Sequence, residues 1–210
     1  MPKLSATHEE GQRQRILAAA LQCMIRHGIH TMSMDQIIAE AGMSSSTVYR
    51  YFPNGRTSIV RTIIEGWFAS IGDHLEGTDF SLHEAGAPSQ GNLEDILTTA
   101  LEAAWNLKVE LAGTQADVAR VTMDLWSACS RNDDLRELCQ AHFVRIHGYI
   151  AAAVTQLQNA GLIGDHISPK DAAKLLHLTM LGLTTQRSLS ASANPRTIAT
   201  LLAPLLAPAS

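Results

Sequence analysis

Two short helical segments near the start of the chain are separated by a tight turn that begins at Gly42. The first segment has apolar residues at the spacing of one helix face, and a glycine is a natural end for such a helix. Ser44 is in position to cap the second segment, in which Val48 and Phe52 lie four residues apart and so share a face. A Pro-Asn-Gly run follows and ends this segment. The pattern predicts a helix-turn-helix.

The rest of the chain also has helical periodicity, and no long strand-like alternation interrupts it. Aromatic residues make up only 5% of the sequence, which favours helices over sheets. The sequence predicts an all-α fold with a three-helix head over residues 1–55 and a larger helical domain over 56–210. The predicted helices begin at Thr7, at Ser33 with Gln36 as a capping box, at Ser44 and at Asn54, followed after a Gly77–Asn92 loop by helices over about 93–111, 115–131, 133–160, 169–190 and 195–206.

Charge is distributed unevenly along the chain, whose formal net charge is −4. Residues 1–61 carry seven basic and four acidic side chains, which gives +3. The remaining residues carry nine basic and sixteen acidic side chains, which gives −7. A basic head on an acidic body can dock on a polyanion with one end only, so the charge pattern is consistent with a head that binds DNA.

The second helix of a helix-turn-helix enters the major groove of DNA, while the first crosses the backbone. Side chains of the second helix that do not face the head's core are therefore candidates for DNA contact. Most of them carry a hydroxyl group, which suits phosphate binding near a helix start, and Arg50 suits a phosphate or a guanine edge. The candidate DNA-binding residues are Ser33, Ser44, Ser45, Ser46, Thr47, Tyr49, Arg50, Tyr51 and Arg56.

Five of these residues also have a purely structural explanation. Ser33 and Ser44 are helix caps whether or not they touch DNA. Tyr49 and, more readily, Tyr51 fit packing across the head, and Arg50 fits an ordinary solvated surface. The prediction of DNA binding depends on the grouping of these residues.

The run from Met34 to Gly55 resembles the signature of TetR-family transcriptional regulators. The matching residues are Ser33, Ile37, Ala41, Gly42, Ser44, Thr47, Tyr49, Tyr51 and Phe52. The resemblance is specific over about residues 10–65. It implies a cytoplasmic, ligand-responsive repressor that binds a palindromic operator as a homodimer and is released by a small, largely apolar effector.

The chain departs from the family pattern at two positions that bear on DNA affinity. Gly55 stands where the family usually has a lysine that commonly touches phosphate. Either Arg56, one position further on, replaces that lysine, or the contact is lost. Ser45 stands where a basic residue is frequent. A third departure, Ile38 in place of a small alanine, is expected to alter packing within the head only.

Two long helical runs in the body are candidates for a dimer interface. The run 169–190 is apolar on nearly every side, so it has to bury more than one face. One face can pack inside its own subunit and another against a partner, in a four-helix bundle; burial inside a monomer is the alternative. The candidate interface residues are Ile146, Ile150, Val154, Leu157, Leu178 and Leu181.

Aromatic and sulfur-containing side chains in the body are candidates for an effector pocket, because ligand sites are mostly apolar with a few polar groups. The alternative, favoured for any single residue, is that they only fill the core. The candidate residues are Trp67, Trp105, Met123, Trp126, Phe143 and His147.

Other classes of function have less support. The sequence contains no HExxH pair, CxxC pair, glycine-rich phosphate loop or GxSxG motif, so we expect neither an enzyme nor a cofactor or metal. The three cysteines are expected to be reduced and buried, and no segment resembles a secretory signal or a membrane span. The alternatives are a helical small-molecule-binding protein or enzyme without DNA binding, and a helical adaptor.

Overall fold

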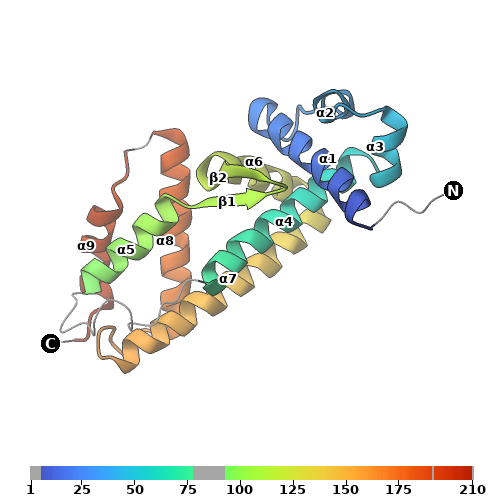
Figure 1. The fold of residues 1–210 in the computed structure, drawn as a ribbon. Coiled ribbons are helices and arrows are strands. Elements are labelled where there is room, and N and C mark those ends of the chain that lie inside the picture. The colour runs from blue at the N-terminus through green and yellow to red at the C-terminus, as the bar shows by residue number, and fades with distance from the viewer. Residues whose placement is uncertain (1–5, 78–92, 191, 210) are drawn as a thin grey trace. The chain divides into compact units, whose positions relative to one another are not determined.

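The structure is a computed structural model that describes residues 6–77, 93–190 and 192–209. These residues form nine helices and one two-stranded sheet (Figure 1), which confirms the predicted all-α fold class. Most of the predicted loop from Gly77 to Asn92 lies outside the described residues. The elements are α1 (Ala6–His27), α2 (Met34–Ala41), α3 (Ser45–Tyr51), α4 (Arg56–Gly77), α5 (Leu93–Trp105), β1 (Lys108–Leu111), β2 (Thr114–Asp117), α6 (Val118–Arg131), α7 (Asp133–Asn159), α8 (Pro169–Leu189) and α9 (Pro195–Leu206).

The chain divides into two compact units. The first unit contains residues 1–71 and 108–139, and so combines α1–α3 and most of α4 with the hairpin, α6 and the start of α7. The second unit contains residues 72–107 and 140–210, with α5, most of α7, α8 and α9. The functional boundary predicted after residue 55 stays a prediction.

The helical head is built around a core that α1, α2 and α3 share with the start of α4. Helix α1 packs against α2 and ends before Gly28, whose φ of 81° allows the chain to turn. Two predicted helix starts were wrong: α1 already includes Thr7, and α4 begins after Gly55 rather than at Asn54. The fully buried side chains of the head include Ile16, Leu21, Met24, Ile37, Val48, Phe52 and Ile59.

A short β-hairpin replaces the ends of two predicted helices. The predicted helices 93–111 and 115–131 are wrong where β1 and β2 pair antiparallel, from Lys108 opposite Asp117 to Leu111 opposite Thr114. The connecting residues Ala112 and Gly113 have φ values of 51° and 70°. A two-residue hairpin turn of this kind requires positive φ at both positions, which a helix does not accommodate. Asp117 then caps α6 by accepting a hydrogen bond from the amide of Ala119.

In the second unit, α5 packs against both α8 and α9. Helices α8 and α9 begin with the same capping arrangement. Ser168 and Asn194 accept hydrogen bonds from backbone amides of the first turn, and a proline follows each of them. Proline is favoured there because the backbone N–H of the first helical residue has no acceptor within the helix, so its absence costs no hydrogen bond.

The turn between α2 and α3 yields a test of backbone strain. Gly42 has a left-handed φ of 60°, so Gly42→Ala is expected to lower the free energy of unfolding by about 1–2 kcal/mol. Urea unfolding measures this change. Gly11→Ala is the matched control, because Gly11 lies within α1 with open space around its Cβ position, and alanine there is expected to stabilise the helix. Equal effects at both positions would contradict the prediction.

Candidate nucleic-acid interface

The α2–turn–α3 unit is fixed by side-chain caps at both helix starts. Ser33 and Gln36 form the predicted capping box: the Gln36 amide donates to Ser33 Oγ at 3.2 Å, and the Ser33 amide donates to Gln36 Oε1 at 2.8 Å. Ser44 caps α3 by accepting from the Thr47 amide at 3.3 Å. Gly42 closes α2 in the left-handed conformation. These local signals fix the turn between α2 and α3.

Helix α3 separates its side chains into a buried and an exposed set. Val48 and Phe52 are buried in the head, as the sequence predicted. The side chains of Ser44, Ser45, Ser46 and Arg50 are exposed, Tyr49 is 43% exposed, and Thr47 is half-buried. Seven of the nine predicted DNA-binding residues, all except Ser33 and Arg56, therefore lie together along one short helix and its cap, with most of them open to solvent.

The hydroxyl groups at the start of α3 form a small cluster. Ser44 Oγ lies 3.1 Å from Ser46 Oγ and 2.8 Å from Thr47 Oγ1. The hydroxyl protons of this cluster can rotate, so each group can also donate to an anion. The cluster surrounds the amide-rich start of a helix, where negative charge is favoured.

Arg50 and Tyr51 form a pair at the other end of α3. The Arg50 guanidinium lies 5.0 Å from the centre of the Tyr51 ring, and its Nη2 donates to Tyr51 Oη at 3.4 Å. The Tyr51 side chain is half-buried, in keeping with its alternative explanation as a packing residue. Stacking on Tyr51 orients the exposed Arg50 while leaving its remaining donors available.

The Arg56 side chain is held by a hydrogen bond to the backbone of the head. It is half-buried, and its Nη2 donates to the carbonyl of Ile29 in the loop after α1. The neighbouring Gly55 has a φ of 58°, and a Cβ there would lie 3.4 Å from the Tyr49 ring. A lysine at position 55 would thus be strained, which accounts physically for the glycine. The structure gives Arg56 a bracing role, and its predicted contact with DNA stays a prediction.

Arg15 is a candidate that the sequence analysis missed. It is exposed on α1, and its Nη2 lies 3.0 Å from the position that a Cβ on Gly42 would occupy. This places a cation beside the turn of the helix-turn-helix. Its basic side chain was the available signal, but only the packing of α1 against α2 brings it to the turn.

The six candidate pocket residues are divided between the two units. In the first unit, Trp67 is 1% exposed and belongs to the core, Trp126 is half-buried, and Met123 is exposed. In the second unit, the Arg187 guanidinium lies 5.7 Å from the centre of the Trp105 ring and donates to the Trp105 carbonyl.

Phe143 and His147 meet a residue of α8 that the sequence analysis did not select. The His177 ring stands edge-on to the Phe143 ring at 5.0 Å between centres, and His177 Nδ1 lies 3.0 Å from His147 Nε2. Burial, together with the nearby His147, lowers the pKa of His177 to about 4. Burial, with His177 and Arg145 nearby, also lowers the pKa of His142 to about 4. Both rings are therefore neutral near pH 7.

The candidate interface residues also fall into two groups. The α7 residues Ile146, Ile150, Val154 and Leu157 are buried within a single chain, so this stripe packs inward and offers no surface to a partner. Leu178 on α8 is 65% exposed, and Leu181 is half-buried.

Within residues 6–77, 93–190 and 192–209, no group of three or more histidine, cysteine, aspartate or glutamate side chains is placed to hold a metal ion. The same residues include no helix that is long and apolar enough to span a membrane.

Comparison with known proteins places the chain among bacterial regulators. Residues 16–57 match the family model of bacterial regulatory proteins of the tetR family, and residues 97–207 match that of the BetI-type transcriptional repressor C-terminal domain. The HTH-type transcriptional regulator SrpR of Pseudomonas putida is 33% identical over 64 residues, which cover 30% of this chain and 30% of SrpR. The chain thus spans less than a third of that curated relative.

Two solved structures resemble nearly the whole chain. Salmonella enterica GusR has a TM-score of 0.66 and 26% identity, with coverage of 93% of this chain and 95% of GusR. The reduced form of E. coli NemR has a TM-score of 0.70 and 19% identity, with coverage of 95% and 100%, and shows the shared fold. Because the two family models together match the helix-turn-helix and over half of the chain beyond it, the chain belongs to the TetR family of bacterial transcriptional regulators.

Proposed function

We propose that the protein is a cytoplasmic repressor that binds a palindromic operator as a homodimer and is released by a small, largely apolar effector. The observation that carries the proposal is the division of α3 into a buried face, with Val48 and Phe52, and an exposed face. A seven-residue helix that presents Tyr49 and Arg50 to solvent while its other side anchors it in the core is suited to the major groove.

The two ends of the exposed face of α3 are suited to different contacts with DNA. The hydroxyl cluster of Ser44, Ser46 and Thr47 at the helix start suits a phosphate, which fixes position. Arg50, oriented by Tyr51, suits a base edge or a second phosphate. Arg15 adds a cation beside the turn and compensates for an Arg56 that is held by Ile29.

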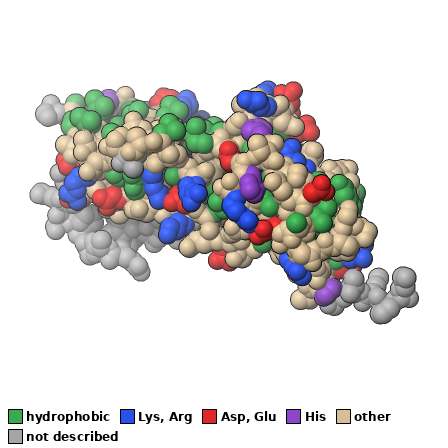
Figure 2. Space-filling view, turned by 90° about the horizontal axis from the view of Figure 1, so that it is seen from above, with side chains coloured by type: hydrophobic (Ala, Val, Ile, Leu, Met, Phe, Trp, Pro, Cys, Tyr) green, Lys and Arg blue, Asp and Glu red, His purple; other side chains and the backbone are tan. Residues whose placement is uncertain are grey.

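Exposed leucines in the second unit support the homodimer. Leu178 on α8 is 65% exposed, and Leu201 and Leu205, one turn apart on α9, are exposed to a similar degree. Figure 2 shows apolar side chains gathered on the surface at the left of the view, where α8 and α9 lie in Figure 1. Water contact with so many large apolar side chains is unfavourable, and an identical pair of helices from a second copy would cover them.

The effector is proposed to bind in the second unit, beside the rings of Phe143, His147 and His177. These side chains combine apolar surface with ring nitrogens that can orient a ligand. An effector that favours one arrangement of α7 and α8 by about 1–3 kcal/mol would be enough to regulate operator affinity.

The test of DNA binding uses fluorescence anisotropy with a duplex selected from a random library by the unmodified protein. Arg50→Ala and Tyr49→Ala are each expected to weaken binding about 10- to 100-fold, because each removes a contact worth about 1–3 kcal/mol. Arg196→Ala is the control, since Arg196 is an exposed arginine at the start of α9. The circular dichroism spectrum and the mass in solution should not change. Unchanged affinity in both α3 variants would refute the assignment of this helix to DNA.

A further inference from the structure

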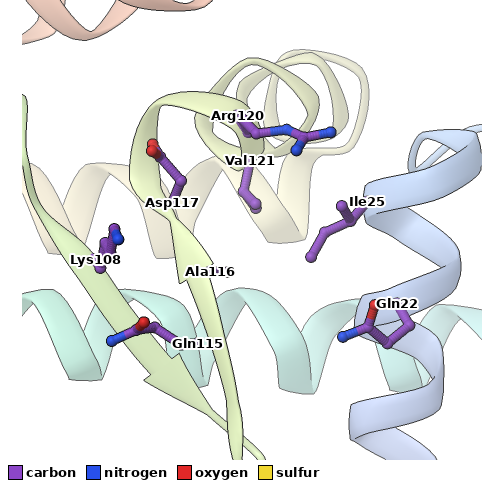
Figure 3. Close-up of a pocket in the computed structure, with 8 residues that line it drawn as sticks. All are labelled: Gln22, Ile25, Lys108, Gln115, Ala116, Asp117, Arg120 and Val121. Carbon is purple, nitrogen blue, oxygen red and sulfur yellow. The ribbon is translucent and has the colours of Figure 1, made fainter.

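A second candidate ligand site lies in the first unit, between α1 and the hairpin with α6. It is a cavity of about 390 Å³, which is within the usual range for small-molecule sites. Figure 3 shows Gln22 and Ile25 projecting from α1 toward β2 and α6, with Arg120 and Val121 coming from α6. The cavity is separate from the rings of Phe143, His147 and His177, which belong to the other unit.

Four polar side chains around this cavity have unused hydrogen-bonding groups. Gln22, Lys108, Gln115 and Arg120 line it, and none of the four side chains forms a hydrogen bond or ion pair with another residue in the part of the chain that the structure describes. Two amides and two cations from four different elements, α1, β1, β2 and α6, thus line one space. Together they can donate several hydrogen bonds to a single ligand.

The charge of the cavity favours an anion. Lys108 and Arg120 contribute two positive charges against one carboxylate, that of Asp117. Asp117 Oδ1 already accepts the hydrogen bond from the Ala119 amide at 2.9 Å, which ties this carboxylate to the start of α6. Ile25 and Val121 add apolar surface on the side of the cavity between α1 and α6.

We propose that this cavity binds a small organic anion, whose carboxylate or phosphate group is neutralised by Arg120 and Lys108 and whose apolar part lies against Ile25 and Val121. Arginine recognises both oxyanions with paired hydrogen bonds, and lysine adds a point charge. The proposal does not rest on operator binding.

The location gives the site a regulatory consequence. Helix α1 packs against α2 of the helix-turn-helix, and His30 Nε2, just after α1, lies 2.9 Å from Ser127 Oγ of α6. A ligand that contacts both α1 and α6 adds a second connection between the same elements. Its occupancy is therefore expected to bias the position of the DNA-binding helices.

The test uses three probes on the full chain without DNA: benzoate, inorganic phosphate and benzamide. Benzoate and phosphate carry the two candidate oxyanions, and benzamide keeps the ring of benzoate without its charge. We expect at least one of the two oxyanions to bind in calorimetric titration. Benzoate, which carries a ring, is also expected to shift the methyl NMR resonances of Ile25 and Val121. Benzamide is expected to bind at least tenfold more weakly than benzoate. Whichever of phosphate and benzoate binds more tightly identifies the preferred oxyanion.

Arg120→Gln and Lys108→Gln are each expected to weaken anion binding about tenfold or more, and together to abolish it. Arg131→Gln is the matched control, because Arg131 is an exposed arginine in the last turn of the same helix. All these positions are exposed, so the variants are expected to fold, and thermal unfolding without ligand checks this.

Three results would overturn the proposal: no binding of either anion, equal binding of benzamide and benzoate, or an equal loss of binding in Arg131→Gln. Because the titration contains no DNA, a failure of operator binding would leave this result unchanged.

Discussion

Glutamate at both Leu178 and Leu201 should leave the chain folded but monomeric. Both side chains are mostly exposed, at 65% and 63%, so their replacement removes little of the chain's own core. In a two-fold dimer each substitution occurs twice, and each buries a carboxylate without a partner, at a cost of about 3–5 kcal/mol. The monomer would hold only one half-site, and operator affinity should fall by roughly 10²- to 10⁴-fold.

Sedimentation equilibrium measures the mass of this variant, and anisotropy measures its operator affinity. Val144→Glu is the control, because Val144 is an equally exposed apolar residue but lies on α7. A variant with both glutamates that stays dimeric would refute the proposed interface. A monomeric Val144→Glu variant beside a dimeric double variant would place the interface on α7 instead.

The helix-turn-helix could be predicted in detail because its determinants are local. The Ser33 capping box, the left-handed Gly42 and the Ser44 cap are each specified by residues within four positions of one another. The buried positions Val48 and Phe52 follow from the helical period alone.

The hairpin was missed because its strands are only four residues long. Alternation over Lys108–Leu111 is too short to be distinguished from a helical pattern, and the residues before and after the hairpin are helical. Gly113 was the one available turn signal, and Ala112 with its positive φ is an unusual partner for it. The hairpin matters for the cavity beside α1, because the polar side chains of Lys108 and Gln115 line it.

Residues of the body could be identified as apolar but not assigned to a surface. The stripe of Ile146, Ile150 and Val154 has the spacing of an interface helix, yet it packs inside one chain. In α8 the apolar residues occur on every side, so the period cannot distinguish exposed Leu178 from buried Leu176. Which face is buried depends on packing against α5, a contact between distant parts of the sequence.

Acidification should destabilise the protein through His142 and His177. Both side chains are buried, and their pKa values of about 4 lie below the ordinary histidine value of about 6.5. The two histidines therefore bind protons near pH 6.5 in the unfolded chain, but only near pH 4 in the folded chain. The free energy of unfolding is expected to fall over this window, by up to about 2 kcal/mol for each histidine at pH 5.

Urea unfolding at pH 7 and at pH 5 measures this effect, and histidine variants separate it from the titration of carboxylates. Among the residues that the structure describes, the basic side chains of His147 and Arg145 lie near the pair, so protonation of either buried ring would place a cation beside other basic groups. His142→Leu and His177→Leu should each reduce the loss of stability between the two pH values, while the exposed His27→Gln should not. Since a domain of this size is stabilised by only about 5–15 kcal/mol, the effect is large enough to measure directly. An unchanged pH dependence in both leucine variants would mean that these two rings do not remain neutral in the folded chain at pH 5.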